Sequence, residues 1–150
     1  MFRGNHPAKI DEKGRLKLPA AFKLLLDASA VTHFYVTSID GQSAEIWPLP
    51  EWEKREKQLA PYSMDDSVQR YMDATSYYGQ QAQSDIQARL TMPQILRQAA
   101  ALNEDVVVLG KLNYLEVVNR EHFESRLKAN ELTAGNRKAL AAILQPRVEG

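Results

Sequence analysis

The first twenty residues alternate apolar and polar side chains in short runs, which a cluster of turn-forming residues separates. Residues 2–10 are expected to form a strand bent near Pro7, and residues 15–18 a second strand, because such alternation is typical of a half-buried sheet. Between them, Asp11–Gly14 has the composition of a turn, since aspartate accepts backbone N–H bonds and glycine adopts positive φ without steric cost. The pattern therefore predicts a hairpin with a charged tip.

A diverged copy of this segment recurs 74 residues later. AKIDEKGRLKLP at residues 8–19 aligns with AQSDIQARLTMP at residues 82–93, with five identities in twelve positions, where average composition gives about one. The identical pairs are Ala8 and Ala82, Asp11 and Asp85, Arg15 and Arg89, Leu16 and Leu90, and Pro19 and Pro93. The chain is therefore predicted to contain a duplicated module.

Each module is predicted to continue as helix, strand, turn, strand and helix. In the first, residues 20–28 carry a helical apolar stripe, residues 34–37 and 44–48 have the composition of strands, and residues 50–59 begin a helix. Residues 93–129 repeat that order in the second module.

Two further helices are expected outside the modules, a connecting helix within residues 62–78 and an amphipathic helix at residues 136–144. The fold class is therefore α+β and β-rich. The predicted organisation is a first module at residues 5–52, connecting helices at 53–79, a second module at 80–124, and a C-terminal helix and tail at 125–150.

Composition places the chain among ordinary globular proteins. Its 150 residues are 44% hydrophobic and 25% charged and include no cysteine, so neither general disorder nor a disulfide framework is expected. No apolar run approaches the roughly 20 residues that span a bilayer, and the first residues lack the apolar core of a signal peptide. A cytosolic location without membrane contact is expected.

Charge is unevenly distributed although the formal net charge is zero. Residues 1–23 contain six basic and two acidic side chains, an excess of four positive charges that the rest of the chain balances. A basic tip on an acidic body attracts polyanions locally. A merely solvated basic face remains the alternative.

Catalytic motifs are absent from the sequence. His6, His33 and His122 have no metal-ligand spacing, and no nucleophile elbow, phosphate-binding glycine loop or cysteine nucleophile occurs. Adjacent Asp11 and Glu12 would point to opposite faces of a strand, which disfavours an acid–base pair. We therefore expect no enzyme activity, no metal, no cofactor and no small-molecule substrate.

The basic side chains of the first hairpin suit nucleic acid. A two-stranded ribbon fits the major groove of DNA, and Arg15 is the candidate for a bidentate contact with guanine. The candidates for phosphate contacts that fix register are Arg3, Lys9, Lys13 and Lys17. The alternative for Arg15 is an ion pair with Asp11, which the recurrence of Asp85 with Arg89 supports, and both roles stay open. Asp11, Gly14 and Asp85 are assigned to the structure of the turns.

Several of these motifs together resemble the MraZ family of bacterial transcriptional regulators. The resemblance rests on Met1-Phe2-Arg3-Gly4, on Asp11-x-Lys13-Gly14-Arg15-Leu16-x-x-Pro19 and on Trp47-Pro48-Leu49-Pro50-Glu51-Trp52, and it extends over nearly the whole chain. Each half also looks like the swapped-hairpin module of AbrB-like DNA-binding proteins.

The resemblance implies a pseudo-twofold, swapped-hairpin barrel built from the two repeats, with peripheral helices. It further implies a homo-oligomeric ring, associated with the nucleoid, that binds tandem promoter repeats in double-stranded DNA and regulates the division and cell-wall gene cluster. The second copy departs from the family pattern, since Ala88 stands where glycine is expected and the flanking lysines are lost. The DNA-binding role is therefore extended only weakly to Gln87 and Arg89. The alternative function is a ring-forming assembly protein whose basic tip binds a protein or another acidic partner.

Overall fold

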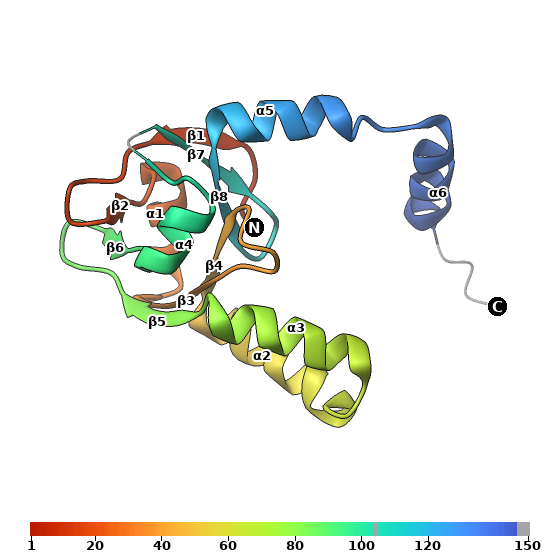
Figure 1. The fold of residues 1–150 in the computed structure, drawn as a ribbon, viewed down its shortest axis with the longest axis horizontal. Helices are drawn as coiled ribbons and strands as arrows, with labels where there is room; N and C mark the ends of the chain where they lie inside the picture. The colour runs from red at the N-terminus through yellow and green to blue at the C-terminus, as the bar shows by residue number, and fades with distance from the viewer. Residues whose placement is uncertain (104, 147–150) are drawn as a thin grey trace. The chain divides into compact units, whose positions relative to one another are not determined.

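A computed structural model of the chain describes residues 1–103 and 105–146 and has a mixed α+β, strand-rich architecture (Figure 1). The strands are β1 (Asn5–Ala8), β2 (Arg15–Lys17), β3 (His33–Thr37), β4 (Ala44–Pro48), β5 (Gln80–Gln83), β6 (Arg89–Thr91), β7 (Val106–Gly110) and β8 (Leu115–Asn119). The helices are α1 (Ala20–Ala28), α2 (Leu49–Leu59), the short 3-10 helix η1 (Ala60–Tyr62), α3 (Asp66–Tyr77), α4 (Gln94–Ala99), α5 (Arg120–Ala129) and α6 (Ala134–Leu144). This order follows the predicted repeat of strands and helices.

Six strands form one antiparallel sheet in the order β1-β7-β8-β4-β3-β5. The first strand of each half lies against a strand of the other half, because β1 pairs with β7 and β5 pairs with β3. The sheet is open among the described residues, since β1 and β5 stand at its two ends and do not pair with each other. Each half therefore completes the sheet of the other.

The prediction that β1 and β2 pair with each other as a hairpin is wrong, although the turn between them is present. The two strands share only an isolated bridge between Ile10 and Leu16. Instead, β2 pairs with β6 in a separate two-stranded ribbon, with Leu16 opposite Leu90. Both leucines are fully buried, so the ribbon contributes its inner face to the common core. Burial of this face against the other half outweighs the local pairing that a short loop would favour.

The two halves are related by an approximate twofold axis, as the pairing of equivalent residues in both sheets shows. In the ribbon, Leu16 opposes its own repeat counterpart Leu90, and in the large sheet Glu45 opposes Glu116, which occupies the corresponding position of the second half. The turns are linked reciprocally as well. The amide of Leu18 donates to the carbonyl of Ala88 at 2.9 Å, and the amide of Met92 donates to the carbonyl of Gly14 at 2.9 Å.

The core lies between the sheet, the ribbon and the helices α1 and α4. Phe22 and Leu26 of α1 and Leu96 of α4 are buried, while Leu25, which the sequence also placed on the apolar stripe, is 42% exposed. Both helices follow a proline, which suits a helix start because its missing N–H is not needed there. The apolar stripe of α1 therefore only partly faces the interior.

The connection between the halves is helical, as predicted. Asp65 caps α3 by accepting the amides of Ser67 at 2.8 Å and Val68 at 3.2 Å. Trp52 of α2 stacks on Tyr35 of the sheet, with ring centroids 4.6 Å apart. The connecting helices are thereby ordered elements rather than a flexible linker.

Residues 1–120 form one compact unit and residues 121–150 a second. Within the second unit, Thr133 and Asn136 form a capping box that begins α6. The C-terminal helix predicted at residues 136–144 corresponds to α6, which begins slightly earlier at Ala134 and ends at Leu144 as expected. A search of the described residues finds no helix whose length and apolar character would suffice to cross a membrane.

Candidate nucleic-acid interface

The turn between β1 and β2 is organised by the carboxylate of Asp11. Its Oδ1 accepts the amides of Lys13 at 3.0 Å and Arg15 at 2.9 Å, and its Oδ2 accepts Nε–H of Arg15 at 2.8 Å. The backbone closes through bonds from the Gly14 amide to the Asp11 carbonyl and from the Asp11 amide to the Arg15 carbonyl, both 2.9 Å. Gly14 has a φ of +79°, which explains glycine at this position. The turn is therefore rigidly bonded rather than a loose loop.

The turn between β5 and β6 repeats this geometry. Asp85 Oδ1 accepts the amides of Gln87 and Arg89, both at 2.9 Å, and Oδ2 accepts Nε–H of Arg89 at 2.8 Å. Ala88 takes the place of Gly14 with a φ of +59°, an uncommon conformation for a residue with a Cβ. The missing glycine, which made the second turn a weaker candidate, has not changed the backbone. The two turns differ in their side chains instead.

Arg15 and Arg89 are both bonded to the aspartates of their turns and partly exposed to solvent. Arg15 and Arg89 are paired with their aspartates, as the alternative interpretation expected, yet their side chains remain 26% and 29% exposed. Each guanidinium donates Nε–H to its aspartate, and among the described residues its two terminal nitrogens stay available as a fork for a phosphate or a base edge.

The aspartates stay ionised in this arrangement. The pKa of Asp11 is lowered, chiefly by the backbone N–H of Arg15, and the pKa of Asp85 is lowered in the same way by the backbone N–H of Arg89. Hydrogen bonds to the charged form favour that form. An ionised aspartate therefore holds each guanidinium in one orientation at neutral pH, which reduces the entropy that a DNA contact would cost.

The ribbon β2–β6 brings basic side chains of both halves together. With Leu16 and Leu90 turned inward, alternation directs Arg15, Lys17 and Arg89 to the opposite, outer face. Lys17 lies directly across from Arg89 in the register. The predicted hairpin placed Lys17 beside β1 and not opposite Arg89, although the repeat already showed that β2 and β6 are equivalent strands. Figure 1 shows both turns protruding on the same side of the unit formed by residues 1–120.

The remaining predicted contacts divide into two groups. Lys9 and Lys13 are exposed next to or within the first turn, and Gln87 is exposed in the second. Arg3 is exposed but is not brought to the turns, because its neighbours Phe2 and Gly4 bond to Leu112 and Gly110 at the far end of β1. The surface near the turns therefore combines Lys9, Lys13, Arg15, Lys17 and Arg89.

The apexes of the two turns differ in chemistry. The first contains Glu12 and Lys13, and the second contains Ile86, which is 99% exposed, and Gln87. One scaffold thus presents a charged apex and an uncharged one.

Acidic residues elsewhere in the described part of the chain have structural roles. Among the described residues, no group of three or more histidine, aspartate and glutamate side chains has the geometry to hold a metal ion. Glu45 and Glu116, which the sequence did not single out, are 8% exposed on the large sheet. Trp47 Nε1–H donates to Glu45 at 2.8 Å and the Ser43 hydroxyl donates to Glu116 at 2.6 Å, so both carboxylates have structural partners. Burial raises the pKa of Glu45.

Comparison with known proteins adds an independent line of evidence. A profile described as "MraZ protein, putative antitoxin-like" matches residues 1–75 and 79–142. A protein of Acidobacterium capsulatum named Transcriptional regulator MraZ is 49% identical over 142 residues, which cover 94% of this chain and 97% of that protein. Its namesake in Koribacter versatilis is 43% identical over 145 residues, covering 95% of this chain and 99% of the other. A further namesake in Saccharopolyspora erythraea is 33% identical over 135 residues, covering 87% and 90%. On this evidence, the chain belongs to the MraZ family.

Proposed function

We propose that this protein is a sequence-specific, DNA-binding transcriptional regulator that acts on the bacterial division and cell-wall gene cluster. Its relatives are named transcriptional regulators. In this proposal the protein is a cytoplasmic, nucleoid-associated ring that binds tandem promoter repeats and carries out no catalysis. The DNA-binding residues are Lys9, Lys13, Arg15 and Lys17, with a weaker contribution from Gln87 and Arg89 of the second turn. Arg3, at the far end of β1, would contact DNA apart from the turns.

The observation that carries the proposal is the outer face of the ribbon. Arg15, Lys17 and Arg89 lie on a two-stranded antiparallel ribbon whose other face is buried. Such a ribbon has the dimensions to enter the major groove, where a guanidinium fork recognises guanine. Lysines at the rim neutralise phosphates and fix the register. The lowered pKa of Asp11 keeps Arg15 oriented for this contact.

The same proposal assigns residues 5–52 and 80–124 to two swapped-hairpin modules joined by connecting helices at 53–79, with residues 125–150 as a C-terminal extension. Support comes from the exchange of β1 and β5 between the halves. It also comes from the two places where equivalent residues of the halves pair with each other, at Leu16 and at Glu45. We infer that the large sheet and the ribbon enclose the core in the manner of a barrel, since buried side chains of both meet in one cluster.

A ring compensates for the small size of each reading surface. One ribbon offers only a handful of phosphate contacts, and non-specific binding of this kind is weak at physiological salt, with a Kd on the order of 10⁻⁴–10⁻⁶ M. Several ribbons on one assembly convert later binding events into intramolecular ones, which raises the overall affinity by about 10²–10⁴. Tandem repeats in the DNA are the matching ligand.

The proposal is tested by binding to duplexes from the region upstream of the protein's own gene, with one, two or four repeats. We expect affinity to rise steeply with repeat number. For each tenfold rise in salt concentration, log K should fall by about 0.9 per phosphate neutralised. Equal affinity for one and four repeats would refute the role of avidity.

Arg15→Ala tests the reading surface itself, and Arg70→Ala is its matched control. Arg70 donates Nε–H to Asp66 at 2.8 Å across the same spacing of four residues, but it lies on α3 with 80% of its side chain exposed. Arg15→Ala is expected to lose about 1–3 kcal/mol of discrimination against the wrong base, whereas Arg70→Ala should bind as the unmodified protein does. If wild-type protein bound acidic proteins but ignored DNA at every salt concentration, the alternative of an assembly protein would replace the proposal.

A further inference from the structure

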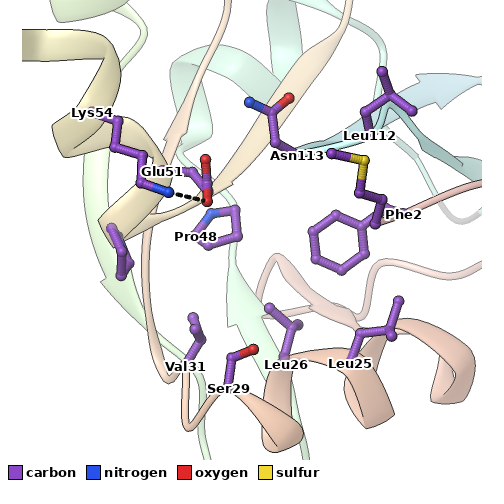
Figure 2. A pocket seen from close by; sticks show the side chains of 12 residues that line it. Phe2, Leu25, Leu26, Ser29, Val31, Pro48, Glu51, Lys54, Leu112 and Asn113 are labelled. Carbon is purple, nitrogen blue, oxygen red and sulfur yellow. Dashed lines mark hydrogen bonds and ion pairs between the residues drawn. The ribbon is translucent and has the colours of Figure 1, made fainter.

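A groove of about 660 Å³ opens on the unit formed by residues 1–120. Its walls come from the N-terminal segment, the end of α1, the start of α2 and the turn between β7 and β8. Figure 2 shows Phe2, Leu25, Leu26 and Leu112 around the apolar part and the ion pair of Lys54 with Glu51 at a rim. Leu25 and Leu112 are 42% and 61% exposed, so the groove presents apolar surface to solvent.

The second unit has the complementary property. Helix α6 carries Leu140, Ile143 and Leu144 on one face, and these side chains are 44%, 77% and 71% exposed. None of the described residues of α6 is buried. An isolated helix of this length is marginal in water, so its apolar face needs a surface to cover it.

We propose that α6 of one copy docks into the groove of a neighbouring copy of this chain. The spacing of its three apolar side chains is that of anchors in helix-in-groove recognition. Arg137 lies one turn before Leu140 and two turns before Leu144, which puts a positive charge on the same face as these anchors. Glu51 at the rim of the groove already pairs with Lys54 through Oε1 at 3.1 Å, and Arg137 would join this pair through the other carboxylate oxygen. The occupant thus matches the groove in apolar character, and its Arg137 has an acidic partner within reach at the rim.

The geometry of such a contact bears on assembly. Helix and groove are different surfaces, so each copy would donate one and accept one in a head-to-tail arrangement. Contacts of this heterologous kind generate a closed ring when the rotation between copies completes a circle. The inference therefore rests on the proposed ring and identifies the surfaces that would hold it together.

Cysteine cross-linking tests the contact directly, because the natural chain has no cysteine. One copy carries only Leu25→Cys and another, with a different affinity tag, carries only Ile143→Cys; the two are co-expressed and treated with a short bis-maleimide linker. We expect a covalent dimer that contains both tags. The matched control replaces Leu25→Cys by Met64→Cys, which lies outside the groove and is 91% exposed, and should yield no such product.

A chain that carries both cysteines distinguishes the source of the helix. Linked multimers support exchange between copies, whereas internally linked monomers would show that α6 covers the groove of its own chain and would overturn the proposal. Absence of the mixed dimer in a preparation that remains a ring would overturn it equally.

Leu112→Glu provides a second measurement by sedimentation, with Met64→Glu as the control. A carboxylate in the groove is costly to bury, so Leu112→Glu should convert the assembly to smaller species while Met64→Glu leaves it intact. An unchanged ring in the folded Leu112→Glu protein would contradict the docking. These outcomes can be distinguished from those that test the proposed function. Cross-linked rings that do not bind DNA would refute the regulatory function and support the contact. Rings that bind DNA but form no cross-link would support the function and refute the contact.

Discussion

Gly14→Ala probes how the first turn is held by the second half of the chain. A Cβ at Gly14 would lie 2.5 Å from Cζ of Arg97, and the backbone there has a φ of +79°. Arg97 also donates Nε–H to the Met92 carbonyl at 3.0 Å. The substitution therefore carries two costs, one in the backbone and one in the displaced guanidinium.

Each cost has a magnitude. Placing alanine in a left-handed conformation costs about 1–2 kcal/mol. Moving the half-buried Arg97 sacrifices its bond to the Met92 carbonyl, for which about 1 kcal/mol is appropriate. Gly14→Ala should therefore destabilise the fold by about 2–3 kcal/mol. At about 2–4 °C per kcal/mol, Tm should fall by roughly 4–12 °C.

Gly4→Ala is the matched control, because Gly4 has a φ of +84° and no atom within 4 Å of the added Cβ. It should show the backbone cost alone, about 1–2 kcal/mol. Arg97→Ala should remove the clash, so the double variant with Gly14→Ala should lose about 1 kcal/mol less than the sum of the single variants. Chemical unfolding at one fixed protomer concentration measures all four proteins. Equal losses for Gly4→Ala and Gly14→Ala, or strict additivity with Arg97→Ala, would refute the proposed contact between the halves.

Three further predictions concern the shared core and the carboxylates. Leu90→Ala empties a fully buried site opposite Leu16 and should cost about 2–5 kcal/mol in chemical unfolding, whereas a value near zero would contradict a ribbon that closes the core. Because burial raises the pKa of Glu45 above its ordinary 4.5, the folded state holds the proton more tightly than the unfolded state, and stability should fall as pH rises from about 4.5 through the raised pKa. Glu45→Gln should flatten this pH profile of stability and raise Tm at about pH 7. An unchanged profile would count against burial of an ionisable Glu45. The pKa of Asp85 is lowered instead, so its contribution to stability is present above the ordinary value of 3.8 and is lost as pH falls through the folded value. Asp85→Asn should therefore make the second turn less sensitive to acid, and hydrogen exchange of the Arg89 amide measures this sensitivity.

Local chemistry made several features predictable from the sequence. The Asp11 and Asp85 turns and the helices that follow them depend on residues a few positions apart, and they occur where the pattern placed them. The repeat also indicated that the two turns would share a geometry. The two turns do share their backbone geometry, although Ala88 replaces the glycine in the second.

The partners of the strands were decided only by the tertiary structure. Nothing in the spacing of β1 and β2 shows that they pair with β7 and β6 rather than with each other, because strand pairing depends on which apolar faces can be buried together across the whole chain. The same long-range packing placed Lys17 opposite Arg89, separated Arg3 from the turns and set Glu45 against Glu116. Sequence thus determined the local conformations and the chemistry of the side chains, whereas burial of two halves in one core determined which of those side chains share a surface.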